Sequence, residues 1–367
     1  MPLRKVMISG GGTGGHIFPA IAIANALKKR DASLDIMFVG AEGRMEMEKV
    51  PAAGYKIIGL KITGMPRTLF TAKWFSFAWN LMNSLSKAKK MIQEFKPDVV
   101  VGVGGYASGP LLKVATGKKI PSVIQEQNSF PGKTNKLLAE KVNKICVAYD
   151  GLDKWFPKEK LVLTGNPVRE EVVQLEGKKA RAAEFFQLDA NKKTILVVGG
   201  SLGAKTINEA IKAGIENFKQ QDVQLIWQTG KNYFEEAKKT VENSAAKNIR
   251  VYDFITKMDL GYAMADVVIS RAGAIAISEL CLVKKPVILV PSPNVAEDHQ
   301  TKNAMALVNH NAAVLVKDAE AKNSLPAKVM ELMNDQTKCD QLKNNITGMG
   351  FTNSADAIAS VIFDLVN

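Results

Sequence analysis

Two glycine-rich turns contain the backbone groups of this sequence that are best suited to binding a phosphate. The first, at residues 10–16, follows an apolar run at 6–9 and precedes a helical stretch. The second, at residues 199–204, follows the apolar run that begins at Thr194. Backbone N–H groups in such turns can approach a phosphate at the positive end of the next helix. Two turns of this kind, one in each half of the chain, indicate a ligand held between two domains.

A histidine directly follows the first turn. His16 is one of only three histidines in the chain. Since its pKa lies near neutrality, an imidazole here could take a proton from a reacting hydroxyl group; alternatively, it orients a sugar or a phosphate. Gly10, Gly12 and Gly15 also satisfy the dinucleotide-binding pattern. The acidic residue that this pattern wants about 20 positions on is missing, and Glu42 comes about ten positions too late. A nicotinamide-dependent enzyme is therefore the weaker alternative.

Four further segments place polar or glycine-rich clusters directly after strand-like runs. In open α/β sheets ligands bind at the carboxyl ends of the strands, so these loops are candidate ligand contacts. In one of them Glu279 lies early in a helix, where its carboxylate could accept hydrogen bonds from ribose hydroxyls. The alternative for Glu279 is a solvated carboxylate on a helix. The four segments are residues 102–110, 125–132, 270–279 and 291–303.

Strand-like and helical stretches alternate along the chain, which is typical of parallel sheets with helical crossovers. The first helix is expected at 17–27. After a charged helical stretch at 178–186 the pattern restarts, so we predict two α/β domains with a boundary near residue 165. The predicted strands are 6–9, 36–39, 55–60, 99–103, 122–124, 144–147, a strand end near 161, a strand from 194, and 224–227, 248–254, 267–270 and 286–290.

The net charge of +13 comes entirely from the first half. Residues 1–165 hold 25 Lys and Arg against 12 Asp and Glu, whereas residues 166–367 hold 24 of each. A one-sided positive field favours an anionic partner, such as a phosphorylated substrate or anionic lipid. No nucleic-acid-binding module is visible, so we expect no nucleic acid partner.

The sequence also excludes several classes of protein. Cys146, Cys281 and Cys339 lie far apart, which excludes a disulfide framework or a zinc finger and fits a reducing cytosol. No run reaches the roughly 18 apolar residues that span a bilayer. The apolar stretch at the start is too short for a signal peptide.

The order and spacing of these motifs resemble the MurG family of bacterial N-acetylglucosaminyltransferases over essentially the whole chain. The resemblance implies a GT-B fold, with two Rossmann-like α/β domains whose parallel sheets face a central cleft. Residues 1–165 would bind the acceptor and the membrane, and residues 166–367 the donor, with the extreme C-terminal helix able to pack back on the first domain. At Gln125 the sequence departs from the family, which has a histidine there. The matching segments are 11–16, 104–106, 126–128, 165–169, 199–204, 271–279 and 299–303.

The implied reaction moves N-acetylglucosamine from UDP-N-acetylglucosamine to the C4 hydroxyl of undecaprenyl-diphosphate-linked N-acetylmuramyl-pentapeptide, with inversion. It would take place at the cytoplasmic face of the inner membrane, in peptidoglycan synthesis. We expect no metal and no cofactor, because glycine turns at helix N-termini can stabilise the leaving diphosphate. His16 is the favoured base and Glu126 the second candidate. The resemblance implies substrate contacts at Thr13, Gly14, Gly15, Tyr106, Asn128, Arg169, Ser201, Ile255, Ala274, Ile275, Ala276, Ile277, Ser278, Glu279 and Gln300.

By the same resemblance, each group of contacts addresses one part of the donor. The backbone of Ile255 and the segment 271–279 address uracil and ribose. Ser201 and the first glycine turn address the diphosphate, while Gln300 and Asn128 address the sugar.

A lipid-linked acceptor requires contact with a membrane surface, and residues 65–95 are the predicted contact. Phe75, Trp79 and Met82 extend the apolar face of this helix beyond what a core needs, and Lys73, Lys87 and Lys90 flank it. Aromatic residues beside lysines suit an interfacial helix on anionic lipid; alternatively, the three apolar residues pack under the neighbouring loop. The predicted core stripe is Trp74, Phe77, Ala78, Leu81, Leu85, Ala88, Ile92 and Phe95.

Two other classes compete with this interpretation. Another GT-B enzyme, such as a UDP-N-acetylglucosamine 2-epimerase, would share the donor half but would need no lipid-facing aromatic helix. A non-catalytic basic scaffold would leave the polar loops after the strands without a role.

Overall fold

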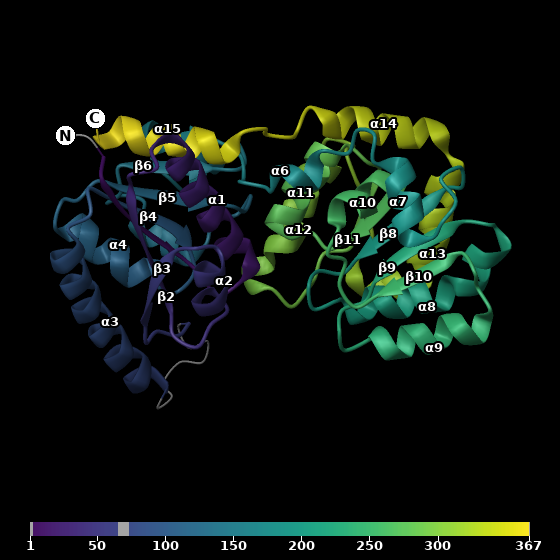
Figure 1. Ribbon diagram of the computed structural model, residues 1–367, viewed down its shortest axis with the longest axis horizontal. Helices are drawn as coiled ribbons and strands as arrows, with labels where there is room; N and C mark the ends of the chain where they lie inside the picture. Colours follow the sequence, from purple (N-terminus) through teal and green to yellow (C-terminus); the bar gives the residue numbers. More distant parts are fainter. Residues whose placement is uncertain (1–2, 65–72, 367) are drawn as a thin grey trace. The chain divides into compact units, whose positions relative to one another are not determined.

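A computed structural model describes residues 3–64 and 73–366 of the 367-residue chain. It divides into two compact α/β units (Figure 1). The first unit runs to Val168 and includes the segment from Thr352 onward, and the second runs from Arg169 to Phe351. The chain therefore leaves the first unit, forms the whole of the second and returns for its final helix.

The first unit is built on a seven-stranded sheet in the order β3-β2-β1-β4-β5-β6-β7, and every pairing is parallel. The order reverses beside β1, at the point where open α/β sheets bind their ligands. Continuous apolar runs make strands that are buried on both faces, as in β4. The strands are β1 (Lys5–Gly10), β2 (Asp35–Ala41), β3 (Lys56–Leu60), β4 (Val99–Gly104), β5 (Ser122–Glu126), β6 (Lys144–Val147) and β7 (Leu161–Leu163).

Helices cover both faces of this sheet because successive strand residues point to opposite sides. Ile8 packs in a cluster with residues of α1 and α15, whereas its neighbour Met7 packs with residues of α3 and α4. The helices of the first unit are α1 (Gly14–Arg30), α2 (Glu46–Ala52), α3 (Lys73–Phe95), α4 (Ser108–Gly117), α5 (Lys133–Leu138) and α15 (Ser354–Val366), with the 3₁₀ turns Leu152–Lys154 and Lys158–Lys160.

The second unit repeats this topology with a six-stranded parallel sheet in the order β10-β9-β8-β11-β12-β13. Its strands are β8 (Thr194–Val198), β9 (Gln224–Gln228), β10 (Ile249–Tyr252), β11 (Val267–Ser270), β12 (Val287–Leu289) and β13 (Val314–Leu315). Its helices are α6 (Glu170–Val173), α7 (Lys179–Phe186), α8 (Lys205–Gln220), α9 (Phe234–Ser244), α10 (Met258–Met264), α11 (Ala274–Val283), α12 (His299–Val308), α13 (Asp318–Asn334) and α14 (Gln336–Thr347), with the 3₁₀ turn Ala296–Asp298 before α12.

The predicted helix at 65–95 is observed as α3 from Lys73, while residues 65–72 lie outside the described part of the chain. Ala88 and Ile92 are buried as predicted. The prediction was wrong at Ala78, which is exposed, because burial is concentrated in the C-terminal half of α3. Ser84 and Met91, which the predicted stripe omitted, are buried there.

Candidate active site

The first glycine turn lies at the carboxyl edge of the first sheet, between β1 and α1. It contacts the turn that follows β4: the Gly11 N–H donates to the Gly104 carbonyl over 3.3 Å. A Cβ on Gly105 would lie 2.3 Å from the Gly11 carbonyl oxygen, and Gly105 has a φ of +88°. Only glycine at this position lets the two turns come so close.

The His16 side chain lies within this pair of turns. Its Nδ1 is 3.0 Å from the Gly11 carbonyl oxygen and 3.4 Å from the Thr13 hydroxyl oxygen. A Cβ on Gly104 would lie 2.6 Å from Cδ2 of the imidazole, so glycine at 104 makes room for the ring. Because a carbonyl oxygen can only accept, Nδ1 donates, and Nε2 of the neutral ring has the lone pair that a base needs.

The rest of the first turn forms the start of α1. Thr13 occupies the N-cap position and is exposed, as is Gly15. Tyr106, from the turn after β4, is exposed and packs against Gly64, where a Cβ would lie 2.7 Å from the tyrosine hydroxyl. The structure thus brings Thr13, Gly14, Gly15, His16 and Tyr106 to one edge of the sheet.

Glu126, the second candidate base, has a different environment from the one expected. It is buried, and its Oε1 accepts from the Asn128 backbone and side chain over 3.0 and 3.1 Å. Its Oε2 accepts from the Gly132 N–H over 3.0 Å and from Asn135 over 2.8 Å. Both carboxylate oxygens accept two hydrogen bonds, so Glu126 holds the loop that carries Asn128. Its part as a second candidate base stays a prediction.

A chain of buried amides continues this loop inward. Gln125 donates to the Asn166 side chain over 2.9 Å, and Asn166 donates to the Gln127 carbonyl over 3.0 Å. Gln127 donates to the Val103 carbonyl over 2.7 Å. Gln125, where the resemblance implied a histidine, is therefore buried and helps to hold the interior of the first unit. Sequence reasoning had not assigned any role to Gln127 or Asn166.

A pocket of about 420 Å³ opens at the carboxyl edge of the second sheet. The N-termini of α8 and α11 both contribute to it, through Ala204 and Lys205 and through Gly273 and Ala276. Two converging helix N-termini favour an anion such as a diphosphate. The pocket is lined by Val198, Gly199, Gly200, Gly203, Ala204, Lys205, Ser270, Arg271, Gly273, Ala276, Ser292, Asn294 and Gln300.

Gln300, for which the resemblance implied a contact with the donor sugar, lines this pocket. Its Oε1 accepts from the Ala272 N–H over 3.2 Å and from the Ser292 N–H over 2.9 Å. The loop that precedes it is strained, because Glu297 and Asp298 both have a φ of +53°. Such backbone conformations persist where the surrounding structure imposes them, and they cluster at ligand-binding sites.

Arg271 lines the same pocket, but its guanidinium group is engaged by other residues of the chain. Its Nη1 donates to the carbonyls of Val290 and Pro291 over 3.0 and 3.2 Å and forms an ion pair with Asp318. Asp318 also accepts from the Thr206 hydroxyl over 3.0 Å. Arg271 therefore ties α8 and the start of α13 to the loop after β12.

Gln228 at the end of β9 is a buried residue that the sequence analysis missed. Its Nε2 donates to the Gly200 carbonyl over 3.0 Å, and its Oε1 accepts from the Ile255 N–H over 2.9 Å. Ile255 was expected to address the nucleobase through its backbone, but its N–H is engaged by Gln228. Ser201, in contrast, lies exposed in the glycine turn that Gln228 holds.

Glu279 lies on α11 between two partners. Its Oε1 is 3.8 Å from Arg169 Nη2, and its Oε2 accepts from the Tyr262 hydroxyl over 3.3 Å. Burial raises the pKa of the Glu279 carboxyl, while the Arg169 cation and the hydrogen bond from Tyr262 lower it in part. The sequence predicted Arg169 and Glu279 as contacts of one substrate, and the structure places them together.

The remaining predicted contacts of α11 differ in exposure. Ile277 is buried, and its N–H donates to the Gly273 carbonyl over 2.9 Å, so its side chain belongs to the core. Ala274, Ile275, Ala276 and Ser278 are partly exposed on the first turns of the helix.

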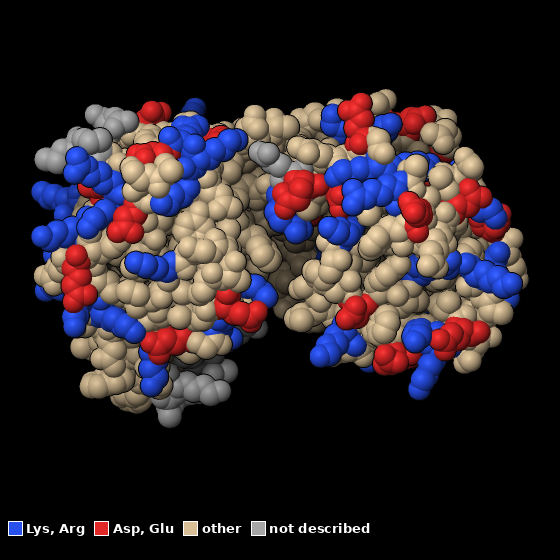
Figure 2. Space-filling model, viewed as in Figure 1, with Lys and Arg blue, Asp and Glu red and all other residues tan. Residues whose placement is uncertain are grey.

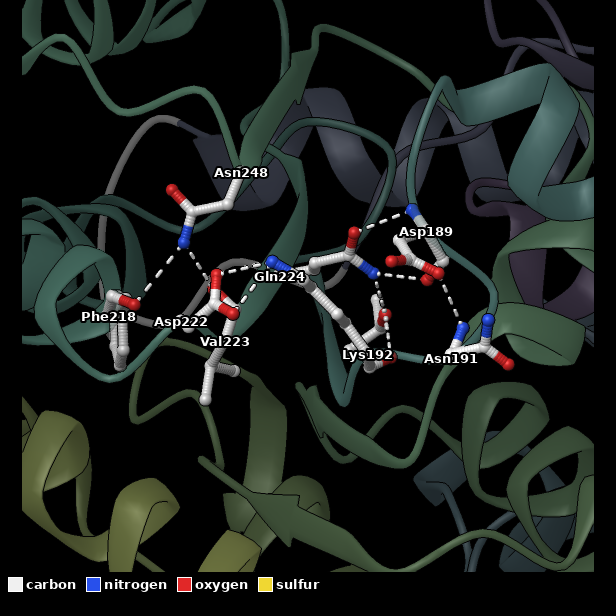
Figure 3. A network of polar contacts seen from close by, with 9 residues as sticks. Asp189, Asn191, Lys192, Phe218, Asp222, Val223, Gln224 and Asn248 are labelled. Atoms are coloured by element: carbon white, nitrogen blue, oxygen red, sulfur yellow. Dashed lines mark hydrogen bonds and ion pairs between the residues drawn. The ribbon is translucent and has the colours of Figure 1, made fainter.

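A second pocket of about 420 Å³ is lined by residues around the amino end of β9. Figure 3 shows its polar network: the Gln224 amide accepts from the Asp189 N–H over 2.7 Å and donates to the Asp189 carbonyl over 2.8 Å. Lys192 pairs with Asp222, and Asn248 donates to the Val223 carbonyl. The polar groups of this network bind one another at the edge of the sheet opposite the glycine turns. The network therefore holds the loops at this edge together.

An exposed apolar patch lies on α3. The exposed fractions of Phe75, Trp79 and Met82 are 82%, 67% and 66%. A group of solvated large apolar side chains on one helix is typical of an interaction surface. Of the flanking lysines, Lys87 pairs with Glu42 over 3.0 Å and Lys90 with Glu94 over 3.8 Å.

Residues 3–64 and 73–366 contain neither a cluster of metal ligands nor a membrane-spanning helix. No group of three or more His, Cys, Asp or Glu in these ranges could hold a metal ion. None of the helices they form is long and apolar enough to cross a membrane.

Family models and curated relatives of this chain agree on one family of glycosyltransferases. The glycosyltransferase family 28 N-terminal domain matches residues 6–147, and the family's C-terminal domain matches residues 194–359. Two curated relatives, from Parabacteroides distasonis and Flavobacterium psychrophilum, are 53% and 52% identical. The first covers 99% of this chain and 98% of its own length, and the second 100% and 99%. Both are named UDP-N-acetylglucosamine–N-acetylmuramyl-(pentapeptide) pyrophosphoryl-undecaprenol N-acetylglucosamine transferase.

Solved structures confirm the predicted GT-B fold. The Acinetobacter baumannii MurG structure is 25% identical, covers 98% of this chain and 99% of its own, and superposes with a TM-score of 0.80. A Neisseria meningitidis UDP-GlcNAc 2-epimerase, 17% identical with a TM-score of 0.68 and covering 99% and 100%, shares the fold alone. The chain belongs to glycosyltransferase family 28 and, within it, to the family of the UDP-N-acetylglucosamine–N-acetylmuramyl-(pentapeptide) pyrophosphoryl-undecaprenol N-acetylglucosamine transferases.

Proposed function

We propose that this chain transfers N-acetylglucosamine from UDP-N-acetylglucosamine to the C4 hydroxyl of undecaprenyl-diphosphate-linked N-acetylmuramyl-pentapeptide. The observation that carries the proposal is the identity of about half of all residues with relatives named for this reaction, over the full length of the chain. The pocket at the N-termini of α8 and α11 supports it, because a nucleoside diphosphate suits such a site.

The second unit binds the donor. The two helix N-termini and Ser201 receive the diphosphate, and their partial positive charge stabilises the negative charge that develops on the departing UDP. The Glu279 carboxylate accepts hydrogen bonds from the ribose hydroxyls, and Ile255 lies near the uracil of the donor. Gln300 binds the sugar, and its amide is already oriented by two backbone N–H groups.

The first unit binds the acceptor and supplies the base. The C4 hydroxyl attacks the anomeric carbon of the donor as the bond from that carbon to the UDP oxygen breaks, which inverts the configuration. His16 Nε2 takes the hydroxyl proton, and the Gly11 carbonyl holds the imidazole through Nδ1. Asn128, fixed by Glu126, contacts the sugar.

The patch of Phe75, Trp79 and Met82 on α3 docks the enzyme to the cytoplasmic face of the inner membrane, where its prenylated acceptor resides. Charge supports this proposal. The first unit holds 25 Lys and Arg against 14 Asp and Glu, whereas the second holds 24 against 22. Figure 2 shows basic side chains on the side of the first unit where Figure 1 places α3 and α4. Anionic lipid headgroups attract such a surface.

The test is transfer of radiolabel from UDP-N-acetylglucosamine to a short-chain prenyl-diphosphate muramyl-peptide by the purified chain. We expect a labelled lipid product with a β linkage and one UDP released for each transfer. Folded protein that transfers no label would contradict the proposal. A parallel incubation without acceptor, followed by NMR, checks for epimerisation of the donor at C2; formation of that epimer would favour the 2-epimerase alternative.

A further inference from the structure

Glu46 is a buried carboxylate to which the mechanism above gives no part. It is the first residue of α2 and is completely buried. Its Oε2 accepts from the Gly12 N–H over 2.9 Å, and its Oε1 accepts from the Ala41 N–H over 3.0 Å. Burying a carboxylate is unfavourable unless hydrogen bonds replace its hydration, so this site depends on both N–H groups.

The neighbouring glycines leave room for the Glu46 side chain. A Cβ on Gly11 would lie 2.1 Å from Oε1, and a Cβ on Gly40 would lie 2.6 Å from Cγ of Glu46. Neither position can hold another residue unless the Glu46 side chain moves. The carboxylate therefore joins the first glycine turn to the end of β2, and the turn is shaped around it.

One peptide group connects Glu46 to His16. The Gly12 N–H that Glu46 accepts and the Gly11 carbonyl beside His16 Nδ1 belong to the same peptide unit. In a trans peptide these groups point in opposite directions, so Glu46 and His16 hold its two ends. A carboxylate that accepts from the N–H polarises the peptide and makes its carbonyl a stronger acceptor. A stronger acceptor favours the tautomer in which Nδ1 carries the proton and Nε2 the lone pair.

We propose that Glu46 is a positioning residue of the transfer reaction, which fixes the orientation and tautomer of His16 through the Gly11–Gly12 peptide. This inference rests on the proposed role of His16 as the base. The arrangement parallels the carboxylate that orients the histidine of a Ser-His-Asp triad, with a peptide group inserted between the two side chains. Glu46 itself touches no substrate.

The first readout requires no substrate. With ¹⁵N-labelled histidine, long-range ¹H–¹⁵N spectra report the tautomer of each imidazole, and His16→Ala assigns the signals of His16 among the three histidines. We expect the Nδ1-protonated form of His16 in the native chain and a larger share of the Nε2-protonated form in Glu46→Gln. A folded Glu46→Gln chain that retains the native tautomer would overturn the inference.

The second readout is kinetic. Because Glu46→Gln acts through His16, we expect kcat to fall about 10- to 100-fold, the range typical of outer-shell partners, while KM for the donor stays within about twofold. Glu46→Asp keeps the charge and should lie between the native chain and Glu46→Gln in both readouts. The matched control is Glu48→Gln on the exposed side of the same helix, which should behave as the native chain does.

The test of Glu46 stays decisive in two further cases, and it can be told apart from the test of the proposed transfer reaction. If Glu46→Gln does not fold, Glu46→Asp carries the test, and a native tautomer together with native kcat in that variant overturns the inference. If the tautomer shifts as expected but the native chain transfers no sugar, the link between Glu46 and His16 holds and the proposed reaction fails.

Discussion

The side-chain amide nitrogen of Gln228 lies 3.0 Å from the carbonyl oxygen of Gly200, in the second glycine turn. Gly200 has a φ of +91°, a conformation that other residues rarely adopt. A buried glutamine on β9 thus fixes a turn that propensity alone would leave loosely defined. The other end of the same amide holds the Ile255 N–H.

Replacing Gln228 should therefore weaken nucleotide binding. Gln228→Leu keeps most of the volume but leaves the buried Ile255 N–H unpaired, which costs about 1–3 kcal/mol. We expect the Kd for UDP, measured by calorimetry, to rise about tenfold as the turn loses its support, and the Tm to fall. Gln221→Leu, at the exposed end of α8, is the control and should change neither value. Unaltered UDP affinity in Gln228→Leu would show that the turn holds its shape without this amide.

Glu279 should give the second unit a pH-dependent stability. Burial raises the pKa of this carboxyl in the folded chain above its ordinary value of 4.5. Between 4.5 and the raised pKa the folded state binds more protons than the unfolded state, so stability falls as pH rises through that window. Glu279→Gln cannot titrate and should lack this fall. The measurement is the Tm of both chains from about pH 4 to 7, and parallel curves would contradict the prediction.

The cation beside Glu279 gives a matched variant. Arg169 lowers the pKa of the Glu279 carboxyl, so Arg169→Met should raise it further and extend the same fall in stability to higher pH. If stability falls over the same pH range in Arg169→Met as in the native chain, Arg169 does not change the pKa of Glu279 in solution.

His16→Ala should abolish most of the turnover while sparing the donor site. Removing a general base lowers kcat by about 10²- to 10⁴-fold. UDP affinity should stay unchanged, because the pocket between α8 and α11 contains no part of His16. His310→Ala, an exposed histidine of the second unit, provides the control. Near-native kcat in His16→Ala would remove this imidazole from the mechanism.

The aromatic patch on α3 should govern attachment to vesicles. Each large apolar side chain that enters the bilayer interface contributes about 1.5–3 kcal/mol. Phe75→Ser with Trp79→Ser should therefore weaken binding to anionic vesicles at least tenfold, while kcat with a water-soluble short-chain acceptor stays native. The control is Phe185→Ser, an exposed aromatic of the second unit. Sedimentation with vesicles measures the binding of the double variant and of the control. If the double variant binds vesicles as tightly as the native chain does, the membrane contact lies elsewhere.

Local pattern was sufficient to predict most of the sheet and one face of α3. The apolar run Val99–Gly104 correctly predicted a buried strand, and the helical spacing of Phe75, Trp79 and Met82 correctly predicted an exposed apolar face. The two-residue strand Val314–Leu315 escaped prediction because it is too short to form a pattern.

The supporting side chains could not be predicted in the same way. Glu46 and Gln228 act through backbone groups that lie 34 and 28 positions away in the sequence, so only the tertiary fold brings them into contact. Glu126 stands within a recognisable motif, yet its residue type alone cannot distinguish a base from a carboxylate saturated by loop N–H groups.

The return of the chain to the first unit affects the order in which the protein can be completed on the ribosome. Ile358, Ala359 and Ile362 of α15 fill the same core as Ile23 and Leu27 of α1. Arg30 of α1 also donates to the Asp356 carbonyl and the Ser360 hydroxyl, over 2.7 Å each. During translation all of residues 169–351 emerge before this core can close. The part of the nascent N-terminal core that α15 covers therefore stays open to solvent until the second unit has been synthesised.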